Sequence, residues 1–156
     1  MGVFKRFYND LRKERTLVEN KELGRIYTSV IEKYNECMDS EEYINSFILI
    51  QSLMEDRLYV MYQLYKYETE GNWYELETYH KMVDLKKIVN ELGNNQWIPQ
   101  ELKRNLITGV EIRNKHIHFS FMGLESYDKD LSESFYYLFR EVDKLLQKHK
   151  QSVYNV

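Results

Sequence analysis

The chain has 156 residues, of which 43% are hydrophobic and 30% charged, and its net charge is −3 at pH 7. This composition is typical of one globular domain with a sizeable core, and the acidic balance excludes a protein whose whole surface attracts nucleic acid. The single cysteine, Cys37, excludes an internal disulfide, and no apolar run reaches signal-peptide or membrane-spanning length, so we expect a cytoplasmic protein.

The first twenty residues predict a short helical arm. Its apolar residues have helical spacing, and five basic against three acidic residues give the segment a local charge of +2. Such an arm could contact RNA or a membrane, but packing against the rest of the protein is the simpler interpretation. We therefore divide the chain into an arm at residues 1–20, a helical domain at residues 21–150 and a tail at residues 151–156 that should fray.

Helical periodicity runs through residues 21–38, about 41–69 and about 74–92. The second segment carries an apolar stripe whose spacing is close to a 3.5-residue repeat, so we expect it to pack lengthwise on a partner helix. Glu55 and Asp56 interrupt the flank of this stripe, either as surface carboxylates or as partners of a cation from another helix. Gly93 and the two asparagines after it predict the end of the third helix.

Two more helices complete the predicted domain. Pro99 suits the first turn of a helix with Gly109 in its middle, where glycine either permits a close helix approach or is merely tolerated. Ser126 or Asp128 can cap the last helix. No strand-like alternation persists anywhere, so the sequence predicts an all-α fold, an antiparallel helical bundle of five to six helices.

The helix after Pro99 leads into the stretch Arg113-Asn114-Lys115-His116-Ile117-His118. Arginine forms forked hydrogen bonds with phosphate oxygens, and histidine is the side chain best able to move protons near neutral pH. Together they could cleave RNA without a metal: His118 would handle the proton of the 2′-hydroxyl or of the leaving group, and Arg113 would stabilise charge on the phosphorus. On a helical projection Arg113 falls inside the apolar stripe, while Asn114 and His118 lie at its edge.

A structural interpretation stands beside the catalytic one. A buried cation needs compensation, so Arg113 could form an ion pair with Glu55, Glu111 or another carboxylate, and His118 could be an ordinary boundary residue. His116 and His118 could bind a metal together only if the helix ended there, and no cluster of cysteines or carboxylates accompanies them. We therefore expect no metal and no cofactor.

The remaining aromatic and histidine residues predict no site with the same clarity. Most of the fourteen tyrosines fall on helical stripes and should pack in the core, although Tyr136, Tyr137 and the group Tyr62, Tyr65 and Tyr67 could stack on bases. His149 has polar sequence neighbours and should be solvated.

An apolar residue, then arginine, asparagine and a histidine five positions after the arginine, all on a late helix, resembles the motif of the HEPN superfamily. More loosely, the succession of helices over about residues 20–150 resembles the helical domain of that superfamily. The resemblance implies a metal-independent endoribonuclease, usually dimeric, in which the Arg-His pairs of two protomers face each other in one composite cleft. It carries over to Arg113, Asn114 and His118 only. One subgroup, the antitoxin-modified toxins, has tyrosine two residues after the histidine; this chain has Ser120 there, so nucleotidylation is not expected.

We accordingly expect an RNA-cleaving enzyme of a toxin-antitoxin or antiviral defence system. It would act as a homodimer, with an antitoxin or other regulatory protein as a further partner and with no membrane or DNA contact. The alternative is a non-catalytic helical adaptor that binds RNA or a partner protein and keeps the motif as structure. An open cleft at the motif favours the enzyme, whereas an Arg113 locked to a carboxylate and shielded from solvent favours the adaptor.

Overall fold

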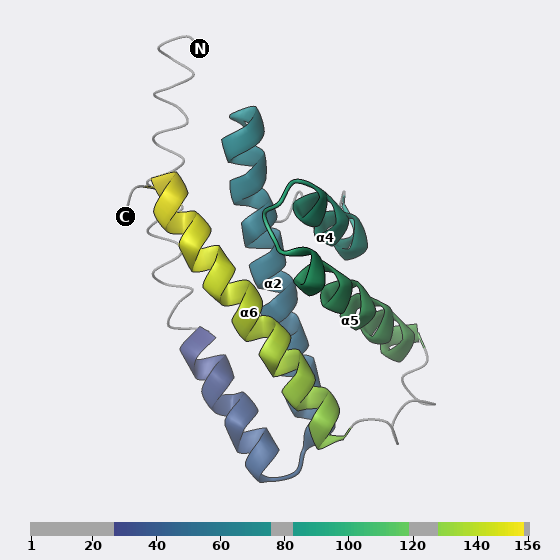
Figure 1. Cartoon of the computed structure of the whole chain (residues 1–156). Helices are drawn as coiled ribbons and strands as arrows, with labels where there is room; N and C mark the ends of the chain where they lie inside the picture. Colours follow the sequence, from purple (N-terminus) through teal and green to yellow (C-terminus); the bar gives the residue numbers. More distant parts are fainter. Residues whose placement is uncertain (1–26, 76–82, 119–127, 155–156) are drawn as a thin grey trace.

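A computed structural model describes residues 27–75, 83–118 and 128–154, with side chains up to residue 114 in the second range and residue 152 in the third. These residues form a helix at 27–39, α2 at Tyr43–Glu70, α4 at Leu85–Asn94, α5 at Gln100–His118 and α6 at Lys129–Tyr154 (Figure 1). No strand occurs within the described ranges, which confirms the all-α prediction. The expected arm at residues 1–20 lies outside them.

The two longest helices, α2 and α6, lie side by side and run in the same direction (Figure 1). The Oγ atoms of Ser46 and Ser132 are 2.8 Å apart near the start of both helices, and Arg57 Nε is 3.2 Å from Asp143 Oδ1 further along. Both pairs join residues 86 positions apart (132 − 46 and 143 − 57), and a constant offset requires parallel helices. The prediction of a uniformly antiparallel bundle is therefore wrong for this pair, because α4 and α5 intervene and return the chain to the end where α2 began.

The helix at 27–39 runs antiparallel to both and packs through its tyrosines. Tyr27 donates to Asp56, and its ring lies 3.6 Å from the Arg57 guanidinium. Tyr34 donates to the backbone oxygen of Ser132 at 3.3 Å and stacks on Tyr136, with ring centroids 5.0 Å apart. These contacts explain how the buried Arg57 is accommodated: an aromatic face covers its guanidinium and a carboxylate lies beside it.

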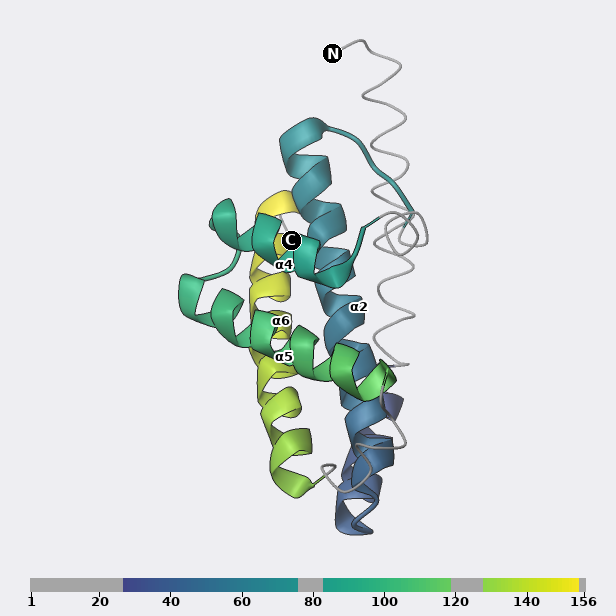
Figure 2. The ribbon, with the colours of Figure 1, turned by 90° about the vertical axis from the view of Figure 1, so that its right-hand side faces the viewer.

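Helices α4 and α5 lie across one side of the α2–α6 pair (Figure 2). The third helix was expected from about residue 74, but the described residues 71–75 and 83–84 are not helical, and α4 begins at Leu85. The side chain of Asp84 accepts a hydrogen bond from Lys87 N at 2.9 Å and caps the helix. Val83, just before Asp84, fits the apolar stripe of the expected helix, so the sequence did not indicate that the helix begins only after Asp84.

The turn between α4 and α5 has the hydrogen bonds of a Schellman motif, from Trp97 N to Leu92 O at 2.9 Å and from Gln96 N to Gly93 O at 3.2 Å. Its left-handed residue is Gln96, with φ +63°, and not one of the residues expected to end the helix. Gly93 instead makes room for the side chain of Lys103, since a Cβ at position 93 would clash with Lys103 Cδ.

Helix α5 approaches α6 closely at Gly109. A Cβ at this position would lie 3.3 Å from Leu138 Cδ1, so the glycine does permit a close helix approach. On the same helix, Leu102, Leu106 and Val110 are buried in the core. Helix α6 starts at the predicted cap, where the Asp128 side chain accepts from Leu131 N at 2.8 Å, and it continues to Tyr154. These contacts fix the orientation of α5 and therefore of the motif that it carries.

Candidate functional site

Arg113 lies on the side of α5 that faces α2. Its Nε atom is 2.5 Å from Glu55 Oε1, and the two side chains are 28% and 16% exposed. Of the carboxylates considered from the sequence, Asp56 is taken by the Tyr27 hydroxyl and Glu111 lies 3.3 Å from Lys86 Nζ, so Glu55 is the partner. The guanidinium is thus paired with a carboxylate while more than a quarter of the side chain stays open to solvent.

The contact between Arg113 and Glu55 is an ion pair by distance but not a well-aligned hydrogen bond. Within the described residues, neither Glu55 Oε1 nor Arg113 Nε has a hydrogen-bond partner of good geometry. The guanidinium does donate from its NH1 group to Asn114 Oδ1 at 2.7 Å. Asn114 therefore turns its carbonyl oxygen toward the arginine, so both an amide and a carboxylate contact the guanidinium.

Tyr59 lies near this ion pair on α2. Its hydroxyl donates to the backbone oxygen of Val83 at 3.2 Å. Burial raises the pKa of Tyr59 above its ordinary value, and the negative charge of Glu55 adds to this effect while Arg113 opposes it. The hydroxyl therefore remains protonated at neutral pH and serves as a neutral neighbour of the pair.

For the third predicted site residue, His118, the structure describes the backbone but not the side chain. Helix α5 remains helical through His118, so positions 114 and 118 are four residues apart and lie one turn apart on the same side of the helix. The side chains of His116 and His118 lie outside the described residues, and so does the metal-site alternative that rested on them. The structure thus brings Arg113, Asn114 and Glu55 together and fixes the helix position of His118.

An exposed apolar strip on α2 was not predicted from the sequence. Ile44 and Ile48 are 36% and 51% exposed, although both are large hydrophobic residues. In helical register they lie on the same side of α2 as Glu55, within about 40° of one another. The strip therefore leads along α2 toward the Arg113–Glu55 pair. The signal in the sequence was two isoleucines four residues apart that do not belong to the main stripe.

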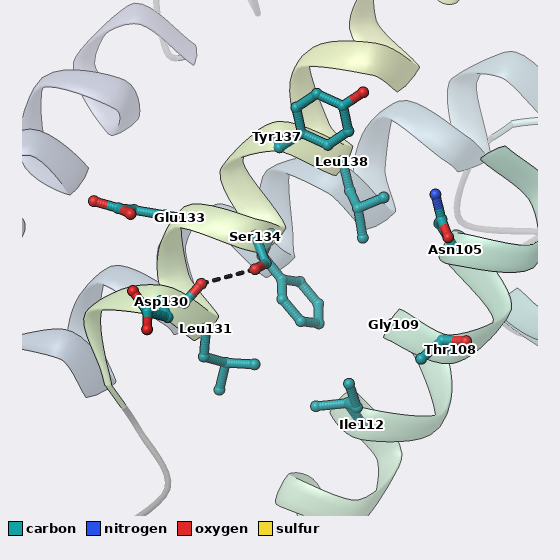
Figure 3. A pocket seen from close by; sticks show the side chains of 11 residues that line it. Asn105, Thr108, Gly109, Ile112, Asp130, Leu131, Glu133, Ser134, Tyr137 and Leu138 are labelled. Atoms are coloured by element: carbon teal, nitrogen blue, oxygen red, sulfur yellow. Dashed lines mark hydrogen bonds between the residues drawn. The ribbon is translucent and has the colours of Figure 1, made fainter. Parts of the chain in front are cut away.

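A cavity of about 670 Å³ opens between α5 and α6, on another flank of α5 (Figure 3). Ile112, Leu131 and Leu138 give it apolar walls, and among the described residues that line it Asp130 and Glu133 are the only charged ones. Neither Arg113 nor Asn114 belongs to the lining. Two carboxylates without a basic side chain would repel phosphate, so this cavity does not suit the chemistry predicted for the motif.

The tyrosines proposed for base stacking are mostly structural. Tyr62 and Tyr65 are buried, Tyr67 packs edge-on against Trp73, and Tyr136 stacks on Tyr34. Burial, together with a bond to Glu91, raises the pKa of Tyr62 to about 12, as expected for a phenol in the core. Of the tyrosines proposed for stacking, only Tyr137, which is 60% exposed, is open to a ligand.

The prediction that His149 is solvated is wrong. Its ring is partly buried and stacks on Trp97 at a centroid distance of 4.1 Å, with Nε2 2.8 Å from the backbone oxygen of Trp97. The neighbouring residues in the sequence are polar, but α6 turns this histidine toward the α4–α5 turn.

Among the side chains that the structure describes, which do not include those of His116 and His118, no group of three or more is placed to hold a metal ion. Across the same part of the chain, no helix combines the length and the apolar character needed to span a membrane. Comparison with known proteins found no family model, no curated protein and no solved structure that matches this chain.

Proposed function

We propose that the chain is a metal-independent endoribonuclease of the HEPN type, with Arg113, Asn114 and His118 as its catalytic residues. The observation that carries the proposal is the guanidinium of Arg113, which contacts Glu55 and Asn114 on a side chain that is 28% exposed. A guanidinium fixed in this way meets a phosphate without first losing the freedom of a long side chain. Its position on the last turns of α5 places it on the same helix as His118.

The chemistry needs only these groups. The 2′-hydroxyl oxygen of RNA attacks the adjacent phosphorus, a 2′-O–P bond forms and the P–O5′ bond breaks. One imidazole removes the 2′-hydroxyl proton and another donates a proton to the departing 5′ oxygen. Arg113 stabilises the negative charge that accumulates on the phosphate oxygens. The products are a 2′,3′-cyclic phosphate and a 5′-hydroxyl, and no metal takes part.

Two imidazoles are available if two copies of the chain combine their motifs in one cleft. The exposed strip of Ile44 and Ile48 supports this arrangement, because it lies on the side of α2 that carries Glu55 and offers apolar surface for a twofold interface. We therefore propose a homodimer that contacts RNA and acts in a toxin-antitoxin or antiviral system, with an antitoxin or other regulatory protein controlling it.

A second candidate is the non-catalytic helical adaptor. The contact between Arg113 and Glu55 favours it, since a paired guanidinium has part of its charge already neutralised. The two functions differ in whether a phosphate binds to Arg113. In the enzyme the substrate phosphate contacts the guanidinium of Arg113, whereas in the adaptor Arg113 serves only to join α5 to α2.

Cleavage of a labelled single-stranded RNA by the purified full chain in excess EDTA tests the proposal. We expect His118→Ala to slow cleavage by about 10²–10⁴-fold and Arg113→Ala to abolish it. Arg104, an exposed arginine on the same helix, and His116, two residues before His118, provide the matched controls. Their alanine variants should retain activity. Cleavage by the His118→Ala variant at the wild-type rate would leave the adaptor as the better interpretation.

Light scattering tests the dimer. The wild-type chain should have twice the mass of one 19.1 kDa chain at micromolar concentration, and Ile44→Asp with Ile48→Asp should give monomers that have lost cleavage. A wild-type monomer that still cleaves RNA would contradict the composite site.

A further inference from the structure

A second cavity lies at the other end of α5, between the α4–α5 turn and the C-terminal part of α6. It has a volume of about 570 Å³. Trp97 and Pro99 from the turn, and Lys148, His149 and Ser152 from α6, contribute to its lining. Gln100, where the turn joins α5, completes the polar rim. We refer to this cavity as the Trp97 cleft.

The charge of the Trp97 cleft is opposite to that of the cavity in Figure 3. Among the described residues, its lining contains a lysine and a histidine but no carboxylate, whereas that of the other cavity has two carboxylates and no basic residue. Lys148 is exposed and forms no ion pair with any residue in the described part of the chain. The protein as a whole has a net charge of −3, but the lysine of this cleft provides local positive charge to which a phosphate can bind.

The aromatic groups of the cleft are held in fixed positions. The ring of His149 stacks on the indole of Trp97 at 4.1 Å with an interplanar angle of 21°, and Tyr65 packs against the indole edge-on. Because the backbone oxygen of Trp97 can only accept, His149 Nε2 carries the proton in their 2.8 Å hydrogen bond. Rings fixed in this way lose little freedom when a further planar group stacks on them.

The polar groups of the rim suit the edge of a base. The side-chain nitrogen of Gln100 donates to Gly93 O at 2.8 Å, which turns its amide in one direction and leaves its oxygen as an acceptor. Gln96 and Ser152 are exposed and can donate and accept. Stacking surface, amides and an unpaired lysine together match a nucleotide: rings for the base, amides for its edge and a cation for the phosphate.

We infer that the Trp97 cleft binds a nucleotide of single-stranded RNA and thereby holds the substrate of the proposed ribonuclease. The identity of the ligand rests on the proposed function, whereas the cleft itself does not. Gln100 and Arg113 are 13 residues apart on α5, or about 20 Å along the helix axis. Binding in the cleft is therefore remote from the chemistry and should affect how tightly RNA binds but not how fast the bound RNA is cleaved.

Tryptophan fluorescence measures binding in this cleft directly. The chain has two tryptophans, so Trp73→Phe leaves Trp97 as the only reporter, and His118→Ala in the same full-length protein slows cleavage enough for binding to be measured. The probe is a uridine oligonucleotide of twelve residues, with inorganic polyphosphate as a polyanion that has no bases. We expect the oligonucleotide to quench Trp97 and polyphosphate not to. Lack of quenching by RNA, or equal quenching by polyphosphate, would overturn the inference.

Two lysines on α6 give a matched pair of variants. Lys148→Glu should weaken oligonucleotide binding about tenfold or more. Lys144, one turn earlier, is exposed but lies outside the cleft and is paired with Glu141, so Lys144→Glu should change binding little. Equal effects of the two variants would indicate general attraction of RNA to α6 and overturn the cleft.

Kinetics separate the inference from the proposed function. In the protein with His118 intact, Lys148→Glu should raise KM about tenfold and leave kcat unchanged. If RNA quenches the fluorescence of Trp97 but the protein with His118 intact cleaves no RNA, the proposed function is contradicted and nucleotide binding in the cleft is not. If the protein cleaves RNA but RNA does not quench Trp97, only nucleotide binding in the cleft is contradicted.

Discussion

Truncation of Arg113 should destabilise the protein, because it leaves the carboxylate of Glu55 largely buried without its cation. Removing one partner of a fully buried ion pair costs about 3–5 kcal/mol, whereas pairs on the surface contribute about 0–1 kcal/mol. With side chains that are 28% and 16% exposed, the pair lies between these limits. We therefore expect Arg113→Ala to lower the free energy of unfolding by about 1–3 kcal/mol, or Tm by about 2–12 °C.

A double-mutant cycle isolates the contribution of the ion pair. Arg113→Ala, Glu55→Ala and the double variant would be unfolded with urea, and the double variant should be more stable than the sum of the single losses predicts, by about 1–2 kcal/mol. Lys86 and Glu111 provide the control, since they are 3.3 Å apart but more than half exposed, and Lys86→Ala should change stability by less than about 0.5 kcal/mol.

An Arg113→Ala variant as stable as wild type, with no coupling to Glu55, would refute the reasoning. The guanidinium would then be held by something other than this carboxylate. Because truncation is expected to lower stability, cleavage assays on the variant belong at a temperature where circular dichroism shows that it is fully folded.

Three further predictions concern the packing around the site. Gly109→Ala should lower stability by up to about 2 kcal/mol, because crowding of Leu138 Cδ1 at 3.3 Å outweighs the better helix propensity of alanine; a gain in Tm would contradict this. Gln96→Gly should raise stability by about 0.5–1 kcal/mol in urea unfolding, because φ +63° strains any residue with a Cβ, and a loss would mean that the glutamine side chain makes a contact worth more than the strain. Burial lowers the pKa of Lys150 to about 8, with the charge of Arg57 adding to the effect. The folded state therefore binds fewer protons than the unfolded state between pH 8 and about 10.4, stability should rise with pH over this window, and Lys150→Met should remove the rise in Tm measured between pH 7.5 and 9.5.

Periodicity in the sequence predicts which residues of a helix are buried but not the direction in which two helices pack. The stripe on α2 correctly indicated a lengthwise partner. That partner is α6, and it runs parallel because two helices separate it from α2 in the chain. An antiparallel arrangement would follow only if neighbours in sequence were also neighbours in space. The pairing of Ser46 with Ser132 records the true register and leaves no local signal in the sequence.

The parts of the site that could be predicted are those whose residues are close together in the sequence. Arg113 and Asn114 stand next to each other, and Glu55 was one of a few carboxylates that could neutralise a cation inside an apolar stripe. The Trp97 cleft was not predictable, because its two walls are about fifty residues apart and meet only when α6 passes the α4–α5 turn. His149 looked solvated for the same reason: its partner, Trp97, lies 52 residues earlier in the chain.

The masses of the reaction products test the central claim most directly. The purified full chain would be incubated in excess EDTA with an RNA oligonucleotide, and with an otherwise identical oligonucleotide that lacks the 2′-hydroxyl at every position. The account predicts fragments of the first that end in a 2′,3′-cyclic phosphate and begin with a 5′-hydroxyl, and no cleavage of the second. Cleavage of both, products with a 5′-phosphate, or activity that appears only when a divalent metal is added would contradict catalysis by Arg113 and His118.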